Sequence, residues 1–405
     1  MHLNRRNFLT GALLGAATAA LRPTRAAAQA PNIAGFDQTQ TEIDPDQPWT
    51  PVSDRKIKMG LVGYGLCQFS VQFGLQNHPN VEIAAVSDLF PDRCAELARV
   101  AKCQKTYPSL EEMIKDDSIE AIFVATDAPA HARHCIEAMK RGKHVATAVP
   151  AVFGDGQLEL ADELLATVKK TGLTYMLFET SAYHDECVAM RKIYRAGGFG
   201  NMIYTEGEYY HYFDPPIDSY KGWRIGLPPQ WYPTHSNAFY INVTGGSFTE
   251  VSCMAHTSAM PMFQPGANPY GNLFGSEIAL FRTSEGGMAR MAVCWDMPTM
   301  HGEQGRNSGE KGSYWFRGYA PAHEEAARLV KALKLKKPQL PPGVDAGGHG
   351  GSHGYLGNEF VEAILQKRKP LIDIVSALNL TVPGIIAHRS ALKGGELLKI
   401  PQYRI

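Results

Sequence analysis

The fold of the N-terminal part of this chain is indicated most clearly by the stretch Lys56-Ile57-Lys58-Met59-Gly60-Leu61-Val62-Gly63-Tyr64-Gly65. A short apolar run enters two glycines, and the residues that follow, through about Gln76, have a helical pattern. A second apolar run, from Val81 to Ser87, ends at Asp88. Strand, glycine turn, helix and second strand together predict a βαβ unit of the dinucleotide-binding kind.

The alternation continues after this unit. Further helices are expected near 92–101, 109–115, 130–141 and 157–170, and further strands at 121–125, 144–147 and 175–178. Strands that alternate with helices predict a parallel, doubly wound sheet. Beyond Gly200 the pattern changes to period-two runs such as 202–210 and 277–282, which predict a mainly antiparallel sheet. The expected fold class is α/β, with an N-terminal Rossmann domain followed by a C-terminal α+β domain.

The N-terminus has the features of a twin-arginine export signal. Asn4-Arg5-Arg6-Asn7-Phe8-Leu9 precedes a weakly apolar run rich in Ala and Gly, and Ala26-Ala27-Ala28 suits cleavage. We therefore expect a signal peptide at 1–28, an extended arm at 29–55, the Rossmann domain at 56–180 and the substrate domain at 181–405, whose last helices can pack back on the first domain. The run is too short and too weakly apolar for a retained membrane anchor, so a periplasmic protein without stable membrane insertion is expected.

Composition excludes several classes of partner. The chain of 405 residues has 40 basic and 40 acidic side chains, and this balance argues against nucleic acid as a ligand and favours a small molecule. Its seven cysteines occur singly, without the spacing of a zinc site or a disulfide framework. No metal is expected.

The glycine turn predicts where a cofactor binds. Gly63 and Gly65 take the two positions at which the backbone bends and approaches a pyrophosphate, whereas Gln68 stands where the third glycine of the fingerprint would be. Asp88 can accept hydrogen bonds from the adenosine ribose and would repel a 2′-phosphate, so NAD is favoured over NADP; the alternative is that Asp88 caps the following turn. The residues expected to contact NAD are Gly63, Tyr64, Gly65, Leu66, Asp88, Thr126, His131 and Glu179.

Three motifs resemble one known family. Gly63-Tyr64-Gly65, Ala125-Thr126 and Gly142-Lys143-His144-Val145 ahead of Pro150 are similar to the glucose-fructose oxidoreductase/inositol dehydrogenase (Gfo/Idh/MocA) family. The resemblance implies that a Glu-Lys-Pro tripeptide follows, with a lysine that works on the reacting hydroxyl. This chain has Ala148-Val149-Pro150 instead, and it has Trp231 where the family places an aspartate four residues before His235.

These departures resemble the NAD-dependent glycoside hydrolase branch typified by α-N-acetylgalactosaminidase, which also lacks the lysine. The stretches that are similar are 176–179 with Tyr183, 206–211, 223–224, 232–235 and the glycine loop 347–351. The branch usually keeps a glutamate where Ala148 stands, so the substrate can differ. The resemblance also implies a homo-oligomer that acts on a carbohydrate.

The candidate catalytic residues are His235, Tyr183 and His211, because oxidation of a sugar hydroxyl needs a base for its proton. The first choice is His235, which lies in a polar turn that contains proline. A packing role is about as plausible for Tyr183 and more plausible for His211. The candidate sugar contacts are Trp223, Arg224, Trp231, Tyr232 and His349, with packing as the alternative for both tryptophans.

The expected compartment then bears on the reaction. A periplasmic enzyme has no obvious pool of NAD(H) with which to exchange, so the cofactor should be retained and regenerated in each cycle. A redox-neutral, glycosidase-like reaction through a transiently oxidised sugar is therefore the leading hypothesis. The alternatives are a net sugar oxidoreductase with a recycled cofactor and a sugar-binding protein without catalysis.

Overall fold

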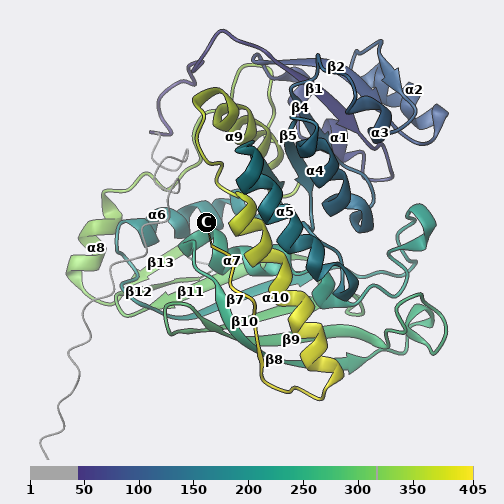
Figure 1. The fold of residues 1–405 in the computed structure, drawn as a ribbon. Coiled ribbons are helices and arrows are strands. Elements are labelled where there is room, and N and C mark those ends of the chain that lie inside the picture. The colour runs from purple at the N-terminus through teal and green to yellow at the C-terminus, as the bar shows by residue number, and fades with distance from the viewer. Residues whose placement is uncertain (1–43, 316–317, 405) are drawn as a thin grey trace, which may run out of the picture.

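The structure is a computed structural model that describes residues 44–315 and 318–404. The expected signal peptide and most of the expected arm lie outside the described residues. Figure 1 shows one layered unit around a parallel sheet and a second built on a broad, mostly antiparallel sheet. The predicted fold class is confirmed.

The first unit contains a six-stranded parallel sheet in the order β3-β2-β1-β4-β5-β6. Its strands are β1 (Ile57–Val62), β2 (Val81–Ser87), β3 (Thr106–Tyr107), β4 (Ala121–Val124), β5 (His144–Ala148) and β6 (Tyr175–Phe178), and its helices are α1 (Phe69–Gln72), α2 (Pro91–Val100), α3 (Leu110–Met113), α4 (His131–Lys140) and α5 (Leu158–Thr171). Every residue of β4 and β6 is buried, which explains their unbroken apolar sequences.

The helix that follows the glycine turn is much shorter than the sequence pattern predicts. Gln68, where the fingerprint's third glycine is missing, adopts a left-handed backbone with φ 49°, so α1 starts only at Phe69. Gly74 has φ 71° and interrupts the chain again before a single 3₁₀ turn at Leu75–Asn77. A one-turn helix has little dipole, so the backbone N–H groups of the turn itself must supply most of the attraction for a phosphate.

The second unit has an eight-stranded sheet in the order β13-β12-β11-β7-β10-β9-β8-β14, antiparallel except where β7 pairs with β10. Its strands are β7 (Met202–Tyr210), β8 (Phe248–Thr257), β9 (Phe274–Thr283), β10 (Met288–Cys294), β11 (Gly302–Gly309), β12 (Gly312–Trp315), β13 (Gly318–Pro321) and β14 (Leu398–Lys399). Its helices are α6 (Asp185–Arg195), α7 (Thr234–Thr244), α8 (Glu324–Lys331) and α10 (Ile374–Leu392). Helix α9 (His353–Gln366) instead lies against the Rossmann unit (Figure 1).

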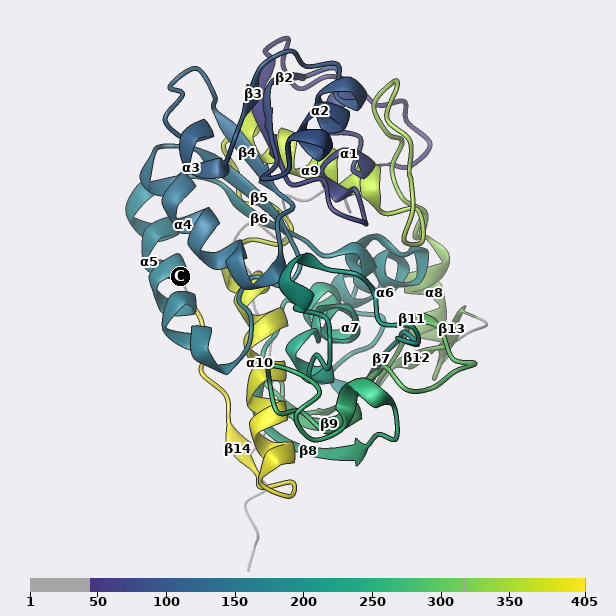
Figure 2. The same cartoon turned by 90° about the vertical axis from the view of Figure 1, so that its right-hand side faces the viewer.

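The long helix α10 joins the two units. It packs on β8 of the antiparallel sheet, and on β6 and α5 of the Rossmann unit, as Figures 1 and 2 show. The backbone N–H of Leu177 in β6 also donates to the carbonyl of Ile372, just before α10. The carboxyl end of β6 is thereby held against the second unit, and a functional site can form where the two meet.

None of the described helices combines the length and the apolar character needed to cross a bilayer. All seven cysteines lie in the described ranges as unpaired thiols, six of them buried and Cys67 partly exposed.

Candidate functional site

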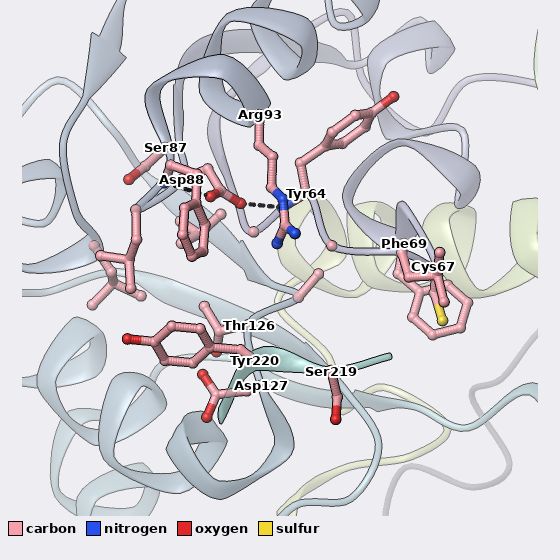
Figure 3. Close-up of a pocket in the computed structure, with 18 of the residues that line it drawn as sticks. Tyr64, Cys67, Phe69, Ser87, Asp88, Arg93, Thr126, Asp127, Ser219 and Tyr220 are labelled. Carbon is pink, nitrogen blue, oxygen red and sulfur yellow. Dashed lines mark hydrogen bonds between the residues drawn. The ribbon is translucent and has the colours of Figure 1, made fainter. Parts of the chain in front are cut away.

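A cleft of about 410 Å³ lies at the carboxyl ends of β1, β2 and β4. Six of the eight residues predicted to contact the cofactor line it: Gly63, Tyr64, Gly65, Leu66, Asp88 and Thr126. The opposite wall comes from the second unit and includes Trp223 and Arg224, two of the predicted sugar contacts. Figure 3 shows Asp88, Arg93 and Tyr64 on one side, and Thr126, Asp127 and Tyr220 on the other.

The glycine turn fits a pyrophosphate. Gly63 has φ 94°, and a Cβ built on it would lie 2.3 Å from the carbonyl oxygen of Ala125. A Cβ on Gly65 would meet no atom within 4 Å, so the backbone there faces open space in the cleft. The first glycine therefore permits the turn, and the second leaves room for the ligand.

Asp88 closes the turn and also faces the cleft. Its Oδ2 accepts from the backbone N–H of Tyr64 at 2.6 Å, and its Oδ1 accepts from the N–H of Phe90 at 2.8 Å. Asp88 therefore caps the turn, which was the alternative role considered for it, and it also lines the cleft. Beside it, the guanidinium of Arg93 lies over the ring of Phe90, 4.6 Å from its centroid.

His235 lies in a buried group of acid and base side chains. It stands in the first turn of α7, and its Nδ1 is 2.8 Å from Oε1 of Glu179 and 3.7 Å from Oε2 of Glu303. His235 is 5% exposed and Glu179 is fully buried. Glu179 directly follows β6, so the Rossmann unit supplies the carboxylate that orients a histidine of the second unit.

The two carboxylates control the protonation of His235. Burial by itself lowers the pKa of His235, but the charges of Glu179 and Glu303 outweigh burial and raise the pKa to about 9. Burial raises the pKa of Glu179, and the charge of His235 and its hydrogen bond more than reverse that, so the net shift is downward. At neutral pH the group therefore holds an imidazolium between carboxylates.

The second ring nitrogen of His235 is free to react. Within the described ranges, Nε2 of His235 forms no hydrogen bond. The atom is not fully enclosed by other protein atoms. The ring lies 5.8 Å from that of Tyr232, and the guanidinium of Arg224, which lines the cleft, lies 5.8 Å from the Tyr232 ring. His235 is thus placed just behind the inner end of the cleft.

Tyr232 occupies the region where the resemblance would put a lysine. Its hydroxyl donates to the backbone carbonyl of Val149 at 3.2 Å. Burial raises the pKa of Tyr232 to about 12 even though Arg224 lowers it, so its hydroxyl stays protonated. Neither Ala148 nor Val149 can transfer a proton, and the single hydroxyl proton of Tyr232 is donated to a backbone carbonyl.

Several predicted site residues lie elsewhere. Tyr183 is 2% exposed and stacks on Tyr355 at 5.6 Å, so it packs in the core and does not face the cleft. Trp231 packs between Phe153 and His388 and is likewise outside the cleft wall. Neither residue therefore lines the cleft, and a proton-transfer role for Tyr183 and a sugar contact by Trp231 stay predictions.

Two predicted cofactor contacts have other roles. The ring of His131 bridges the carbonyl oxygens of Pro150 and Thr126 and is 1% exposed, so it supports the cleft wall from beneath. Glu179, as described above, holds His235 and is not part of the cleft lining. Both side chains are buried, Glu179 just after β6 and His131 at the start of α4, and a sequence pattern does not distinguish a ligand contact from a support at either position.

His211 and His349 border the site. Burial lowers the pKa of His211, and so do the neighbouring charges of Arg224, His301 and His235. His349 has φ 47° in the glycine loop, its Nδ1 is 2.9 Å from Nε2 of His353, and its ring lies 5.7 Å from that of Phe69 in the cleft wall.

Sequence reasoning missed Glu303 and His184. Glu303 is the second residue of β11, and its Oε2 accepts from the Ser181 hydroxyl and lies 3.3 Å from Nε2 of His184. No local motif marks Glu303, because strand pairing across the second sheet brings it to the site. Glu179, His235 and Glu303 also have ligand atoms within 4.8 Å of one another, a spacing that a divalent cation could use.

Known proteins resemble this chain at two levels. Residues 57–179 match a family model described as an oxidoreductase family with an NAD-binding Rossmann fold. A glycosyl hydrolase family 109 protein of Solibacter usitatus is 24% identical over 86% of this chain and 88% of its own length. A protein of the same designation from Stenotrophomonas maltophilia is 24% identical over 88% of this chain and 91% of its own length.

The solved structures include a levoglucosan dehydrogenase in complex with NADH and levoglucosan. It superposes with a TM-score of 0.71 at 17% identity and covers 86% of this chain and all of its own. This likeness bears on the fold, whereas the family model identifies residues 57–179 as a domain that binds NAD.

NAD should bind more tightly than NADP. The Asp88 carboxylate in the cleft would repel a 2′-phosphate, and we expect about a tenfold or greater preference, which corresponds to about 1.4 kcal/mol. Calorimetry on protein stripped of cofactor measures both affinities. Asp88→Ala should reduce the preference, whereas Asp127→Ala, which removes another cleft carboxylate, should preserve it. Tighter NADP binding by wild type would instead assign Arg93 as the partner of the phosphate.

Proposed function

Because residues 57–179 are an NAD-binding domain of the Gfo/Idh/MocA oxidoreductase family, we propose that this enzyme uses NAD to oxidise a sugar hydroxyl transiently. The observation that carries the proposal is the Glu179–His235 pair behind the inner end of the cofactor cleft. It supplies a base held in one orientation, at the place where the family lysine is missing.

The reaction begins with removal of a proton from the hydroxyl. NAD supplies a hydride acceptor when bound. Nε2 of His235 takes the hydroxyl proton, while Glu179 holds Nδ1 and stabilises the imidazolium that results. The cation of Arg224 can donate a hydrogen bond to the oxygen that loses the proton, whereas the one hydroxyl proton of Tyr232 is already donated to the Val149 carbonyl.

We propose that the cycle is redox-neutral. A ketone would acidify the neighbouring C–H, so a base could take that proton as the bond to the anomeric oxygen breaks and the leaving oxygen takes up a proton. Water would then add across the C=C bond, and the reduced cofactor, when bound, would supply the hydride that restores the hydroxyl. The relatives designated glycosyl hydrolase family 109 favour glycoside hydrolysis as the net reaction. The expected export supports it too, since no NAD(H) pool outside the cytoplasm is needed for a retained cofactor.

The reaction type is tested on purified protein that retains its cofactor. Mass spectrometry of the released nucleotide should find NAD, and a panel of 4-nitrophenyl glycosides, N-acetyl-α-galactosaminide included, should release nitrophenol without stoichiometric NADH. Accumulation of NADH with a ketosugar would establish the net oxidoreductase. Bound NAD without turnover of any sugar would establish a binding protein.

The activity should depend on pH through His235. Only neutral His235 accepts a proton, and its pKa of about 9 means that kcat/KM should rise with pH and level off above that value. Glu179→Gln should move the inflection to lower pH, because it removes a carboxylate that raises the pKa. The pH profile of the wild type decides: an inflection near 6.5 would show that the carboxylates do not control the base.

We further propose export through the twin-arginine route with NAD already bound. The support is Arg5-Arg6 in a chain that also carries a dinucleotide domain. Replacing both arginines with lysine should leave precursor in the cytoplasm. Periplasmic recovery equal to that of wild type would contradict the proposal.

We also propose a homo-oligomer that uses the open face of the eight-stranded sheet. Helices α7 and α10 pack on the other face, whereas four apolar side chains are exposed on the open one: Met254, Ile278, Leu280 and Met288. Light scattering should give a mass above that of one chain, and Leu280→Glu should reduce it. A monomeric wild type would contradict this proposal.

A further inference from the structure

A line of acid and base groups leads from His235 to the protein surface. We propose that Glu303, His184 and Glu186 form a proton path that connects His235 with solvent. The inference rests on the proposed function of His235 as the base, and it adds residues that the reaction scheme above does not use.

The geometry gives the path its order. Oε2 of Glu303 lies 3.7 Å from Nδ1 of His235 and 3.3 Å from Nε2 of His184. Nδ1 of His184 lies 3.8 Å from Oε1 of Glu186, whose side chain is 36% exposed. None of these three contacts is a hydrogen bond in the structure, and the buried Nε2 of His184 has no hydrogen-bond partner in the part of the chain that the structure describes. Side-chain rotations that align the groups would let protons pass from carboxylate to imidazole in sequence.

Glu179 cannot provide the same exit. Its Oε1 is occupied by His235 and by the backbone N–H of Ser181, and its Oε2 is fully enclosed without a hydrogen-bond partner. Glu179 is fully buried, so a proton passed to it has no direct exit to solvent. The two carboxylates beside the base therefore have different tasks, because Glu179 orients His235 and Glu303 relays protons.

The glycine loop covers the middle of the path. A Cβ on Gly350 would lie 2.6 Å from the His184 ring, so only glycine lets the loop lie this closely over it. Lys337 fixes the loop, since its Nζ donates to the carbonyls of Gly350 and Gly351 and pairs with Asp185. His184 is 9% exposed as a result, so water has little direct access to its ring. Neighbouring side chains therefore offer a better route for a proton than direct exchange with water.

Electrostatics support a proton on His184. Burial lowers the pKa of His184, but the carboxylates of Glu186 and Glu303 outweigh it and the net shift is upward. His184 can therefore take a proton from Glu303 and release one from its other nitrogen toward Glu186. Lys337, the cation nearest this end, is already paired with Asp185.

The path balances the reaction. When the hydroxyl O–H breaks, the proton binds Nε2 of His235, and NAD, when bound by the family domain, would supply the acceptor for the hydride. The N–H bond at Nδ1 of His235 then breaks as Glu303 takes that proton. Glu303 passes a proton to Nε2 of His184, and Nδ1 of His184 releases one through Glu186. The reverse sequence restores the proton when the carbonyl is reduced.

The test follows the imidazole N–H of His235 by NMR in NAD-loaded protein labelled with ¹⁵N-histidine. In wild type this N–H should exchange with water quickly despite its burial. His184→Gln and Glu303→Gln should each slow the exchange by about tenfold or more, since each removes one acid-base group. His256→Gln is the control, because His256 also lies near a carboxylate, at 3.9 Å from Asp296, but its side chain is 72% exposed and on β8.

Melting temperature and bound NAD are measured on the same samples, and Glu303→Gln keeps the proposal testable if His184→Gln fails to fold. Exchange as fast as in wild type in both variants would overturn the path. So would a shift of the His235 signals after treatment of wild type with a chelator, because a cation would then occupy Glu179, His235 and Glu303. No substrate is needed, so a failure here is distinct from a failure of the proposed reaction.

Discussion

The His235→Ala variant should turn over substrate about 10²- to 10⁴-fold more slowly than wild type while it retains NAD. Neither Val149, which is apolar, nor Tyr232, which keeps its proton, can replace His235 as the base. His235 is outside the cleft lining, so the cofactor should remain bound. Turnover, melting temperature and NAD content are measured on one preparation.

Removal of His235 also leaves the buried Glu179 carboxylate without its partner, so the melting temperature of His235→Ala should fall. His235→Gln separates the two effects, since its amide can still donate to Glu179 but cannot take a proton. Tyr183→Phe is the comparison, because the structure places Tyr183 in the core. Normal turnover in His235→Gln with a large loss in Tyr183→Phe would transfer the proton chemistry to Tyr183.

The two glycines of the cofactor turn should respond differently to alanine. Gly63→Ala should destabilise the protein and abolish NAD retention, because a Cβ would lie 2.3 Å from a backbone carbonyl at φ 94°. The left-handed backbone alone costs an alanine about 1–2 kcal/mol. Gly65→Ala meets no protein atom within 4 Å, so the stability of the cofactor-free protein should be unchanged while NAD binding weakens.

Thermal denaturation and calorimetry with NAD measure both effects. If Gly65→Ala bound NAD as wild type does, the pyrophosphate would not lie against this turn. If Gly63→Ala were as stable as wild type, the described turn geometry would be wrong.

Local pattern was enough to predict the strands and the cofactor turn. An apolar run entering Gly63 and a second run ending at Asp88 are features of neighbouring residues. The structure has both strands, and Gly63 and Asp88 line one cleft. The helix after Gly65 was predicted too long, because helical periodicity does not register the left-handed backbone of Gln68 or the break at Gly74.

The acid-base group depends on contacts that no local pattern contains. Glu179 and His235 come from different units, and Glu303 arrives on a strand of the second sheet. The sequence drew attention to Tyr183, but the 3₁₀ turn Thr180–Tyr183 directs it into the core, whereas the next residue, His184, faces Glu303. Side-chain direction within a turn is set by packing, which a single sequence does not specify.

Reaction in D₂O distinguishes a redox-neutral cycle through an oxidised sugar from direct hydrolysis of the glycoside. NAD-loaded enzyme is incubated with a 4-nitrophenyl glycoside that it cleaves, and the released sugar is examined by NMR. Deuterium bound to the carbon next to the anomeric centre is the predicted result, because elimination removes that hydrogen and addition of water replaces it from solvent. A released sugar without carbon-bound deuterium would show direct hydrolysis and contradict the redox-neutral cycle.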